Sequence, residues 1–405
     1  MPEIMKLGGY HTMMTGKWHL KGSPVDRGFD RYFGFLNGAS NFFTGESVYG
    51  RTYFRLDHQE FWVPKEGFYC TDDFTDYAMR FLDDREKHTT QKANPFFLYV
   101  AYNAPHYPLQ APREEVNKYQ GKYMDGWDML RKTRLARMKK MGVVPPDQKL
   151  SSRPQNIEEF KLLSAQEQAH RDLMMATYAG MIDRVDQNVG RLLKKLDSLG
   201  ESDNTLILFL SDNGACPFQR SQKKTIEHNF APWNPDSFWC YDQRWAHACN
   251  TPWRKFKQNQ HEGGVATPLI AHWPKGITNP GRFERQRGHL VDLHATCREL
   301  AGVDYPKQHH GQPIGAARGI SLVPHFTQKR REEHKELFYY FNSSKTALLQ
   351  GDWKLVDSSE LYNIREDRIE SNDLAATHPE RLERMQARWH ELAERYGVRE
   401  SPKKP

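Results

Sequence analysis

Two continuous apolar runs stand out along a chain whose hydrophobic and polar residues are otherwise mixed. Residues 96–101 (FFLYVA) end just before Asn103, and residues 205–210 (TLILFL) end at Ser211. Runs of this length, apolar on both faces, are typical of strands in the middle of a parallel sheet that helices cover on both sides. We therefore predict two buried strands of one parallel sheet.

A long helical pattern precedes the second run. Apolar residues recur every three or four positions from Met174 to Leu199, and Gly200 is a plausible stop. A helix, a short loop and a buried strand form one link of a doubly wound α/β fold. Ligands of such folds bind beyond the carboxyl ends of the strands, which is where His106 and Asp212-Asn213 fall.

The remaining pattern divides the chain into regions. Residues 113–164 are basic and weakly periodic and predict a helical surface insertion, whereas residues 215–250, rich in Trp, Pro, Asn and Gln, predict a loop region over the active site. From about residue 336, short strand-like pieces are followed by one amphipathic helix. We predict an α/β domain over residues 1–335 and a small antiparallel sheet with one helix over residues 336–405.

Charge and cysteine content exclude several classes of protein. The 58 basic residues are mixed with 51 acidic ones, and the main basic run, residues 131–140, is more typical of a solvated helix face than of a nucleic-acid-binding arm. The five cysteines form no C-x-x-C pair, which disfavours a disulfide scaffold or a zinc ribbon. We expect neither a membrane span nor a signal peptide within this chain, and the pattern does not fix an oligomeric state.

Two cations have neighbours that suit anion chemistry. Lys17 and His19 would share a face if their segment is extended, and a cation beside an imidazole suits an anionic group that must be held and protonated. Lys257 precedes Gly263-Gly264, a pair that allows close backbone approach. Taken singly, each residue is more typical of solvated surface.

The two strand ends carry the other candidates. Asp212 and Asn213 offer hard oxygen ligands that suit Ca²⁺ or Mg²⁺, although Asp-Asn-Gly is also a common turn. His106 ends the first strand and, taken alone, is more typical of a structural histidine.

The order of these motifs carries more information than any one of them. The chain contains, in sequence, GYHTMMTGKWHL, FFLYVAYNAPHYP, YAGMIDRVDQNVGRLL, LILFLSDNGA and NTPWRKFKQNQHEGGVATPLIAHWP. This series resembles the formylglycine-dependent sulfatases of the alkaline phosphatase superfamily, arylsulfatase-like members above all, and the resemblance spans nearly the whole chain. It implies an alkaline-phosphatase-like α/β fold, with a mostly parallel central sheet flanked by helices, and hydrolysis of aryl or carbohydrate sulfate esters to an alcohol and sulfate.

The resemblance also assigns roles to residues. Lys17 and Lys257 would bind the sulfate oxygens, His19 would contact the hydroxyl of the hydrated formylglycine, and His106 would bind sulfate and help to protonate the leaving oxygen. Asp212 and Asn213 would be two of the Ca²⁺ ligands, with Mg²⁺ as the alternative ion. The implied substrate is a sulfated small molecule or carbohydrate, and the implied location of the full-length protein is periplasmic or secreted.

The family's nucleophile motif has no counterpart in this sequence. Similar proteins carry a strand ending in paired aspartates, and then Cys/Ser-x-Pro/Ala-x-Arg, upstream of the segment that begins here at Gly16. Residues 216–220 and 23–27 have the right end residues, but Phe218 and Val25 occupy the third place. We therefore expect the formylglycine, and a first core strand, in a segment absent from this chain.

Three explanations follow: an N-terminal truncation, a split enzyme, or a non-catalytic pseudoenzyme that binds sulfated glycans. Each predicts an unpaired central sheet edge, too few oxygens for tight Ca²⁺ binding, and no sulfatase turnover by the isolated chain. The truncation is favoured, because the chain starts in a helical pattern around Ile4. The alternative chemistry on the same fold is that of a phosphate or phosphonate monoester hydrolase.

Overall fold

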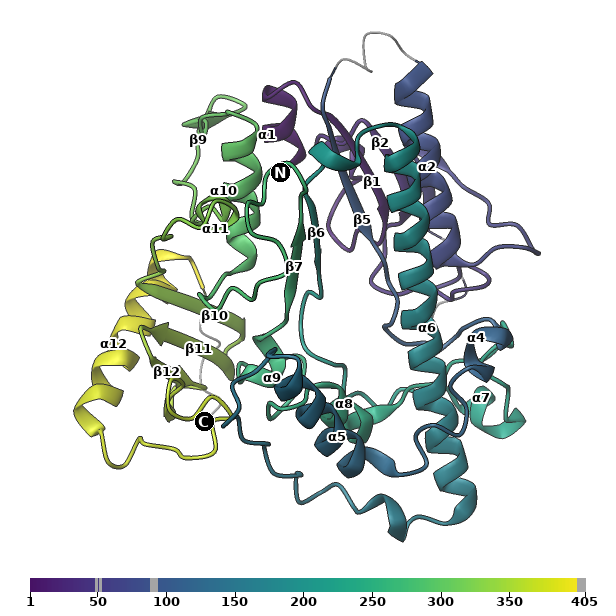
Figure 1. The fold of residues 1–405 in the computed structure, drawn as a ribbon, viewed down its shortest axis with the longest axis vertical. Coiled ribbons are helices and arrows are strands. Elements are labelled where there is room, and N and C mark those ends of the chain that lie inside the picture. The colour runs from purple at the N-terminus through teal and green to yellow at the C-terminus, as the bar shows by residue number, and fades with distance from the viewer. Residues whose placement is uncertain (48–49, 51–52, 88–93, 399–405) are drawn as a thin grey trace.

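The centre of the molecule is a five-stranded sheet flanked by helices (Figure 1). The computed structural model describes residues 1–47, 50, 53–87 and 94–398. In the order of the sheet, the strands are β4 (Gln59–Glu60), β3 (Phe54–Leu56), β2 (Arg31–Phe35), β1 (His11–Gly16) and β5 (Phe96–Ala101). β1 runs parallel to β2 and β5, whereas β3 pairs antiparallel with β2 and β4. The α/β class is confirmed.

β1 is buried on both faces, although the hydrophobic pattern did not predict a strand there. Met13 and Met14 are both 0% exposed, and alternation sends Met13 into the main core and Met14 to the opposite face, beside Phe29 and Tyr32. Helix α2 (Cys70–Lys87) covers the sheet by contacting β1, β2 and β5. Helix α1 (Pro2–Leu7) contacts β1 and α10 (Leu290–Leu300). β1 is therefore the most firmly enclosed strand of the sheet.

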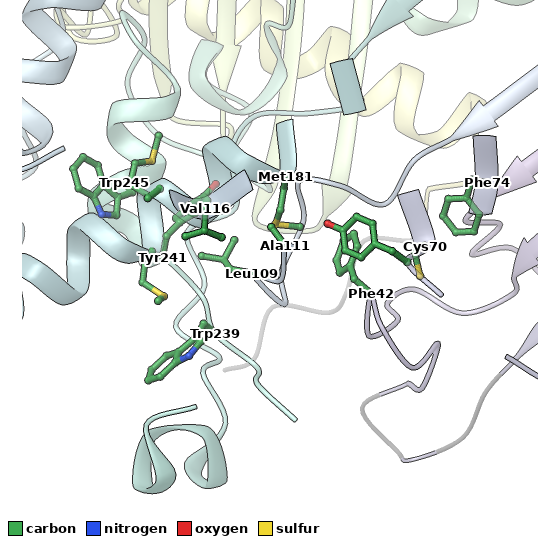
Figure 2. Close-up of a cluster of buried hydrophobic side chains, with 14 of the residues drawn as sticks. Phe42, Cys70, Phe74, Leu109, Ala111, Val116, Met181, Trp239, Tyr241 and Trp245 are labelled. Carbon is green, nitrogen blue, oxygen red and sulfur yellow. The ribbon is translucent and has the colours of Figure 1, made fainter. Parts of the chain in front are cut away.

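The predicted long helix is α6 (Ala165–Ser198), which packs against α2. It begins with a capping box in which the Ser164 hydroxyl accepts from Glu167 N and the Glu167 carboxylate accepts from Ser164 N. It ends just before Gly200, whose φ is +70°. Aromatic and sulfur side chains of several segments fill the space around it (Figure 2).

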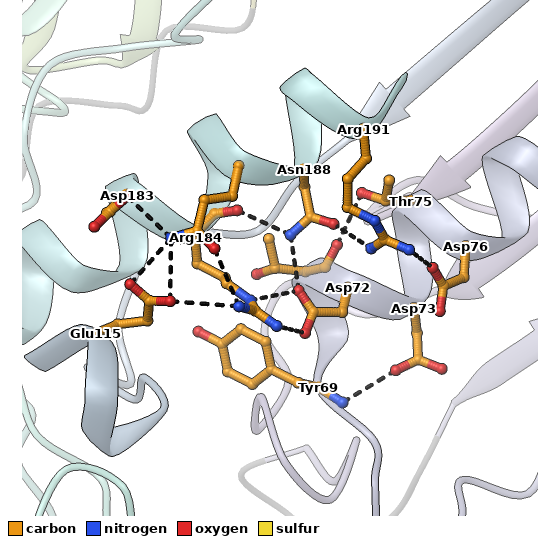
Figure 3. A network of polar contacts seen from close by, with 12 residues as sticks. Tyr69, Asp72, Asp73, Thr75, Asp76, Glu115, Asp183, Arg184, Asn188 and Arg191 are labelled. Atoms are coloured by element: carbon orange, nitrogen blue, oxygen red, sulfur yellow. Dashed lines mark hydrogen bonds and ion pairs between the residues drawn. The ribbon is translucent and has the colours of Figure 1, made fainter. Parts of the chain in front are cut away.

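A polar network joins α2, α6 and α4 (Arg113–Asn117) at one side of the sheet (Figure 3). Arg184 of α6 donates to both carboxylate oxygens of Asp72, at 2.8 and 2.6 Å, and also to Glu115. Asn188 donates at 2.7 Å to Asp72 Oδ1, the oxygen that also accepts from Arg184 Nε. A bidentate guanidinium–carboxylate pair fixes direction as well as distance, so the network sets the register between the two long helices.

The two strands expected at the middle of one sheet lie at sheet edges. β5 ends the five-stranded order, and β6 (Ile207–Leu210) pairs antiparallel with β7 (Leu269–His272) in a separate ladder. Tyr99 of β5 is 50% exposed and Phe209 of β6 is 46% exposed. Their apolar pattern matches a strand covered on both sides, but in the described part of the chain neither strand has a ladder partner on its other side.

Two regional predictions need correction. Residues 113–164 contain α4, α5 (Gly126–Lys140) and the 3-10 turn η2 (Phe160–Leu162), but this segment is not simply a surface insertion. Arg131, in the basic run, is buried and donates to the Ser151 hydroxyl at 2.7 Å, because the helix packs against the segment around His247. Residues 215–250, predicted as a loop region, also include two helices, α7 (Lys223–His228) and α8 (Asp242–Cys249).

The C-terminal residues form the predicted small antiparallel sheet with one helix. The strands β10 (Glu336–Asn342), β11 (Lys345–Gln350), β12 (Trp353–Val356) and β13 (Glu360–Asn363) pair in order, and α12 (Pro379–Arg395) packs on them. The remaining short elements are η1 (Val25–Arg27), η3 (Ser202–Asn204), α9 (Glu262–Val265), α11 (Val323–Phe326), β8 (Gln308–His309) and β9 (Gln312–Pro313). Within the described ranges, no helix has both the length and the apolar character to cross a membrane.

Candidate functional site

The carboxyl ends of β1 and β5 bring the first two candidates together. Gly16 is the register partner of Ala101, and Lys17 N donates to Ala101 O at 2.9 Å. A Cβ on Gly16 would lie 2.1 Å from that oxygen, and one on Gly34 would lie 1.9 Å from Gly16 O. Only glycines allow this approach, which places Lys17 at the same end of the sheet as the segment leading to His106.

His106 is held in one tautomer. Its Nδ1 lies 2.9 Å from Tyr107 O, and its Nε2 lies 3.3 Å from Lys257 Nζ. Because a carbonyl only accepts and an ammonium only donates, Nδ1 carries the proton and the lone pair of Nε2 faces Lys257. The pKa of His106 is lowered to about 4, mainly by burial and also by the positive charges of Lys257 and Lys17, so the ring is neutral at pH 7.

Lys17 and His19 belong to the same electrostatic cluster. Burial, followed by the charge of Lys257, lowers the pKa of Lys17, and the carboxylate of Asp212 partly offsets this effect. Partial burial lowers the pKa of His19 as well, although the residue is largely exposed, and both lysine ammonium groups contribute. A Cβ on Gly38 would lie 2.5 Å from His19 Nε2, so the ring rests directly against that glycine.

The extended conformation assumed for residues 17–19 is wrong at His19, whose φ is +57°. The backbone turns there because Trp18 N donates to Phe35 O and His19 N donates to Leu36 O, which ties the segment to the end of β2. The strand alternation is therefore not what brings the two side chains to one place.

Lys257 reaches the site on a loop between α8 and α9. Its amide donates to Ala215 O at 3.1 Å, and Gly214 N donates to Gly264 O at 3.0 Å. A Cβ on Gly214 would lie 1.8 Å from Gly263 O. The glycine pair thus gives the close backbone approach that the sequence predicted, and it attaches the loop to the turn that carries Asp212.

Asp212 and Asn213 have donor atoms of the right kind for a hard cation, but too few of them. Asp212 is exposed at the end of β6, where its charge acts on Lys17, His106 and Tyr99. Among the described residues, no three His, Cys, Asp or Glu side chains gather as metal ligands. Ca²⁺ takes six to eight oxygens, so these residues do not by themselves fit the ion, and we assign no chemical step to it.

The structure adds three neighbours that the sequence reading did not assign to the site. Arg220 Nη1 donates to the Tyr107 hydroxyl at 3.0 Å, which places a third cation at the Tyr107 ring, whose centre lies 4.3 Å from that of His106. Asn103 is 8% exposed, and its Oδ1 has no hydrogen-bond partner among the described atoms. Its position two residues after the end of β5 was the available signal for Asn103. Nothing local marked the pairing of Arg220 with Tyr107.

A cavity of about 530 Å³ lies beside this region and not within it. His170, Trp239, Gln219 and Ser221 are among its lining residues, and the six candidates are not. The arginine in the cavity lining, Arg171, is already paired with Asp242 at 2.6 Å. We therefore place the site at the clustered cations, because an anion requires them.

Together, the fold and the clustered cations at its strand ends define an α/β protein suited to a tetrahedral anion. The family model named Sulfatase matches residues 1–303, and the chain belongs to the sulfatase family. This family hydrolyses sulfuric esters, and its members are in general metal-dependent.

Individual relatives agree with this assignment. An uncharacterized sulfatase of Schizosaccharomyces pombe is 30% identical over 99% of this chain and 78% of its own length. An arylsulfatase of Klebsiella aerogenes is 30% identical over 83% of this chain and 75% of its own length. A solved structure of a protein in complex with its substrate D-glucosamine-2-N,6-O-disulfate covers 100% of this chain and 83% of that chain, with 21% identity and a TM-score of 0.57. The alkaline-phosphatase-like fold is thereby confirmed.

Proposed function

We propose that Lys17, His106 and Lys257 hold the sulfate group of a sulfate ester for hydrolysis to an alcohol and sulfate. The observation that carries this proposal is the convergence of two lysine ammonium groups on one neutral histidine from three separate segments. Burial and then the repulsion of Lys257 lower the pKa of Lys17, so a bound anion would relieve a cost that the free site carries.

Each residue has a chemical task in this proposal. Lys17 and Lys257 stabilise the sulfate oxygens, where charge is concentrated in the transition state. The carbonyl of Tyr107 holds the proton of His106 on Nδ1, so the unprotonated Nε2 faces Lys257, the ammonium proposed to bind the sulfate. A bound anion raises the pKa of His106, so Nε2 can take up a proton and deliver it to the leaving oxygen.

Two roles depend on groups outside this chain's own residues. Hydrated formylglycine supplies the nucleophilic oxygen in similar sulfatases, and we assign His19 to contact its hydroxyl. Asp212 and Asn213 are this chain's proposed contribution to a Ca²⁺ site, with Mg²⁺ as the alternative ion. Both assignments come from the resemblance to the family. The charge of Asp212 acts on Lys17, and the charge of Lys17 acts on His19, which supports them.

We propose a sulfated carbohydrate as the substrate class, with an aryl sulfate as the alternative. Arg220 supports the carbohydrate, because a further cation next to Tyr107 can meet a second anionic group of a polyanionic sugar. The known substrate of the solved relative is a disulfated glucosamine, which agrees with this choice. By the same resemblance, we propose a periplasmic or secreted location for the full-length protein.

The test is calorimetric titration of the purified chain with 4-nitrophenyl sulfate and with 4-nitrophenyl phosphate. Lys17→Met and Lys257→Met should each weaken sulfate-ester binding roughly 10- to 100-fold, because a hydrogen bond to a charged group contributes about 1.5–3 kcal/mol. Lys223→Met is the matched control, since Lys223 is exposed on α7. Tighter binding of the phosphate ester would support the phosphate or phosphonate monoester hydrolase instead.

A further inference from the structure

A lysine of the C-terminal sheet is buried among carboxylates. Lys354 of β12 is 1% exposed, and its Nζ lies 2.9 Å from Glu262 Oε1 and 2.8 Å from Glu370 Oε1. A buried ammonium is tolerated only when opposite charges compensate its lost hydration, and here there are two. We call Glu262, Lys354 and Glu370 the Lys354 cluster.

The cluster crosses from the C-terminal sheet to the helix that follows the Lys257 loop. Glu262 begins α9, and its backbone N donates to Glu370 Oε2 at 2.8 Å. Arg368 Nε donates to the other Glu262 oxygen, Oε2, at 3.1 Å. Both the backbone and the side chain of Glu262 are therefore held by residues that lie more than 90 positions later in the chain.

The other end of the Lys257 loop is attached to the same subdomain. The Arg254 guanidinium donates to Glu370 O and lies 6.0 Å from the centre of the Tyr362 ring. Next to Glu262, His261 Nε2 lies 2.8 Å from Glu360 Oε2 on β13. Contacts with the C-terminal residues thus bracket the loop on both sides of Lys257.

The backbone around Arg254 and that around Gly263, at the two ends of the Lys257 loop, are in direct contact, so we expect Lys257 to move when these ends move. Gly263 N donates to Arg254 O at 3.0 Å, which joins the two ends directly. A Cβ on Gly263 would lie 2.2 Å from that oxygen, and one on Gly264 would lie 1.9 Å from Asn259 O. A displacement of Glu262 is therefore transmitted to Lys257, whose Nζ is 3.3 Å from His106 Nε2.

We propose that Lys354 and Glu370 are positioning residues, which fix the Lys257 ammonium at the anion site. Neither of their own side chains is a candidate to bind the anion. The sequence disguises this role, because a lysine in a short strand of a terminal subdomain is ordinarily solvated. The sulfate-binding part of the inference rests on the proposed function. The coupling of the cluster to the loop does not.

The test uses the full chain with the double variant Lys354→Met/Glu370→Gln, which removes one charge of each sign. The matched control is Arg388→Met/Glu336→Gln, because this pair is also bonded, at 2.9 Å, within the C-terminal subdomain but does not contact the loop. Inorganic sulfate is the ligand. The readouts are its Kd by calorimetry, amide hydrogen exchange over residues 254–264, and thermal unfolding.

We expect the cluster variant to raise the Kd for sulfate about tenfold and to speed exchange over residues 254–264 at least tenfold, with exchange in β1 unchanged. The control should leave both readouts at the wild-type value. Lys354→Arg alone keeps the charge at this position, so this variant should retain most of the wild-type affinity for sulfate. If the double variant does not fold, Glu370→Gln alone, which keeps the Lys354–Glu262 pair, is measured in its place.

Loop exchange equal to that of the control would overturn the inference. Faster exchange with an unchanged Kd would also overturn it, because Lys257 would then not depend on the cluster. If the wild-type chain binds no sulfate, the proposed function fails by itself, and the exchange measurement still decides whether the cluster holds the loop.

Discussion

The ammonium of Lys257 lies 3.3 Å from Nε2 of His106, although 151 positions separate the two residues in the chain. The contact presents an unprotonated nitrogen to a cation, which is stable only while His106 stays neutral. It therefore links the protonation of His106 to whatever occupies the space around Lys257, and an arriving anion would change both at once.

The first prediction concerns this link. Lys257→Met should raise the pKa of His106 above its present value of about 4, because one of the positive charges that disfavour imidazolium is removed. The titration can be followed by NMR of the ring protons in the full chain. Lys223→Met, which removes a distant exposed charge, should leave the titration where it is, and equal shifts in both variants would refute direct coupling.

The second prediction concerns His19. Gly38→Ala should displace the His19 ring, because the new Cβ would lie 2.5 Å from Nε2. Because the ring belongs to the same charge cluster as Lys17, we expect its displacement to weaken sulfate-ester binding severalfold. Thermal unfolding should be nearly unchanged, since the ring is exposed and can swing outward. Gly190→Ala in α6 is the control. Its Cβ meets open space, so it should stabilise the helix by roughly 0.5–1 kcal/mol and leave binding alone.

The third prediction is a loss of stability as the pH falls below 6.5. The pKa of His106 is about 4 and that of His247 about 3, both lowered mainly by burial from an ordinary value of 6.5. Between pH 6.5 and the lowered pKa of each histidine, the unfolded chain binds more protons than the folded one. The free energy of unfolding therefore decreases as the pH decreases. At the acidic limit, each histidine lowers the free energy of unfolding by at most about 3–5 kcal/mol.

Urea unfolding at pH 7.5, 5.5 and 4.5 measures this dependence. His106→Asn should flatten the curve within that range, while the curve above pH 6.5 should not change slope through this residue. An unchanged slope between pH 6.5 and 4.5 in the variant would show that His106 does not titrate as the structure requires.

The fourth prediction has the opposite sign and concerns the network in Figure 3. The pKa of Asp73 is raised to about 6, mainly by burial and also by the carboxylates of Asp76 and Asp72, although the Tyr69 N–H bond opposes this. The folded state therefore carries a disfavoured charge above pH 6, and it gains stability as the pH falls through 6 and Asp73 takes up a proton.

Asp73→Asn should accordingly raise the Tm at pH 8, because Asn can still accept from Tyr69 N, now at 3.0 Å from the carboxylate. The advantage should shrink as the pH approaches 5. Asp147→Asn, at an exposed position, serves as the comparison. A gain in Tm that is the same at pH 8 and pH 5 would mean that the charge of Asp73 is not its cause.

Local pattern was sufficient for the elements whose packing repeats along the chain. The apolar run 96–101, the 3.6-residue period of α6 and the short strands of the C-terminal sheet could all be read in this way. β1 could not, because Thr12, Thr15 and Gly16 interrupt its apolar residues, and the Thr12 hydroxyl is satisfied only by Gly28 O and Asp30, which are distant in sequence.

The candidate residues were found by motif order, whereas their mutual geometry required the fold. The tautomer of His106 depends on Tyr107 O, and the backbone turn at His19 depends on the end of β2. The Lys354 cluster was beyond reach for the same reason. Its three members come from two regions and look unrelated until the C-terminal sheet is placed against α9.

The contact of Gly16 with Ala101 and Gly34 has a consequence for how this protein tolerates change. Because a single added methyl group would overlap a neighbouring main-chain oxygen at either glycine, relief requires the strands themselves to separate. In a saturation library selected for folded protein, positions 16 and 34 should therefore accept almost nothing, whereas exposed Leu20, only four residues further on, should accept nearly every amino acid.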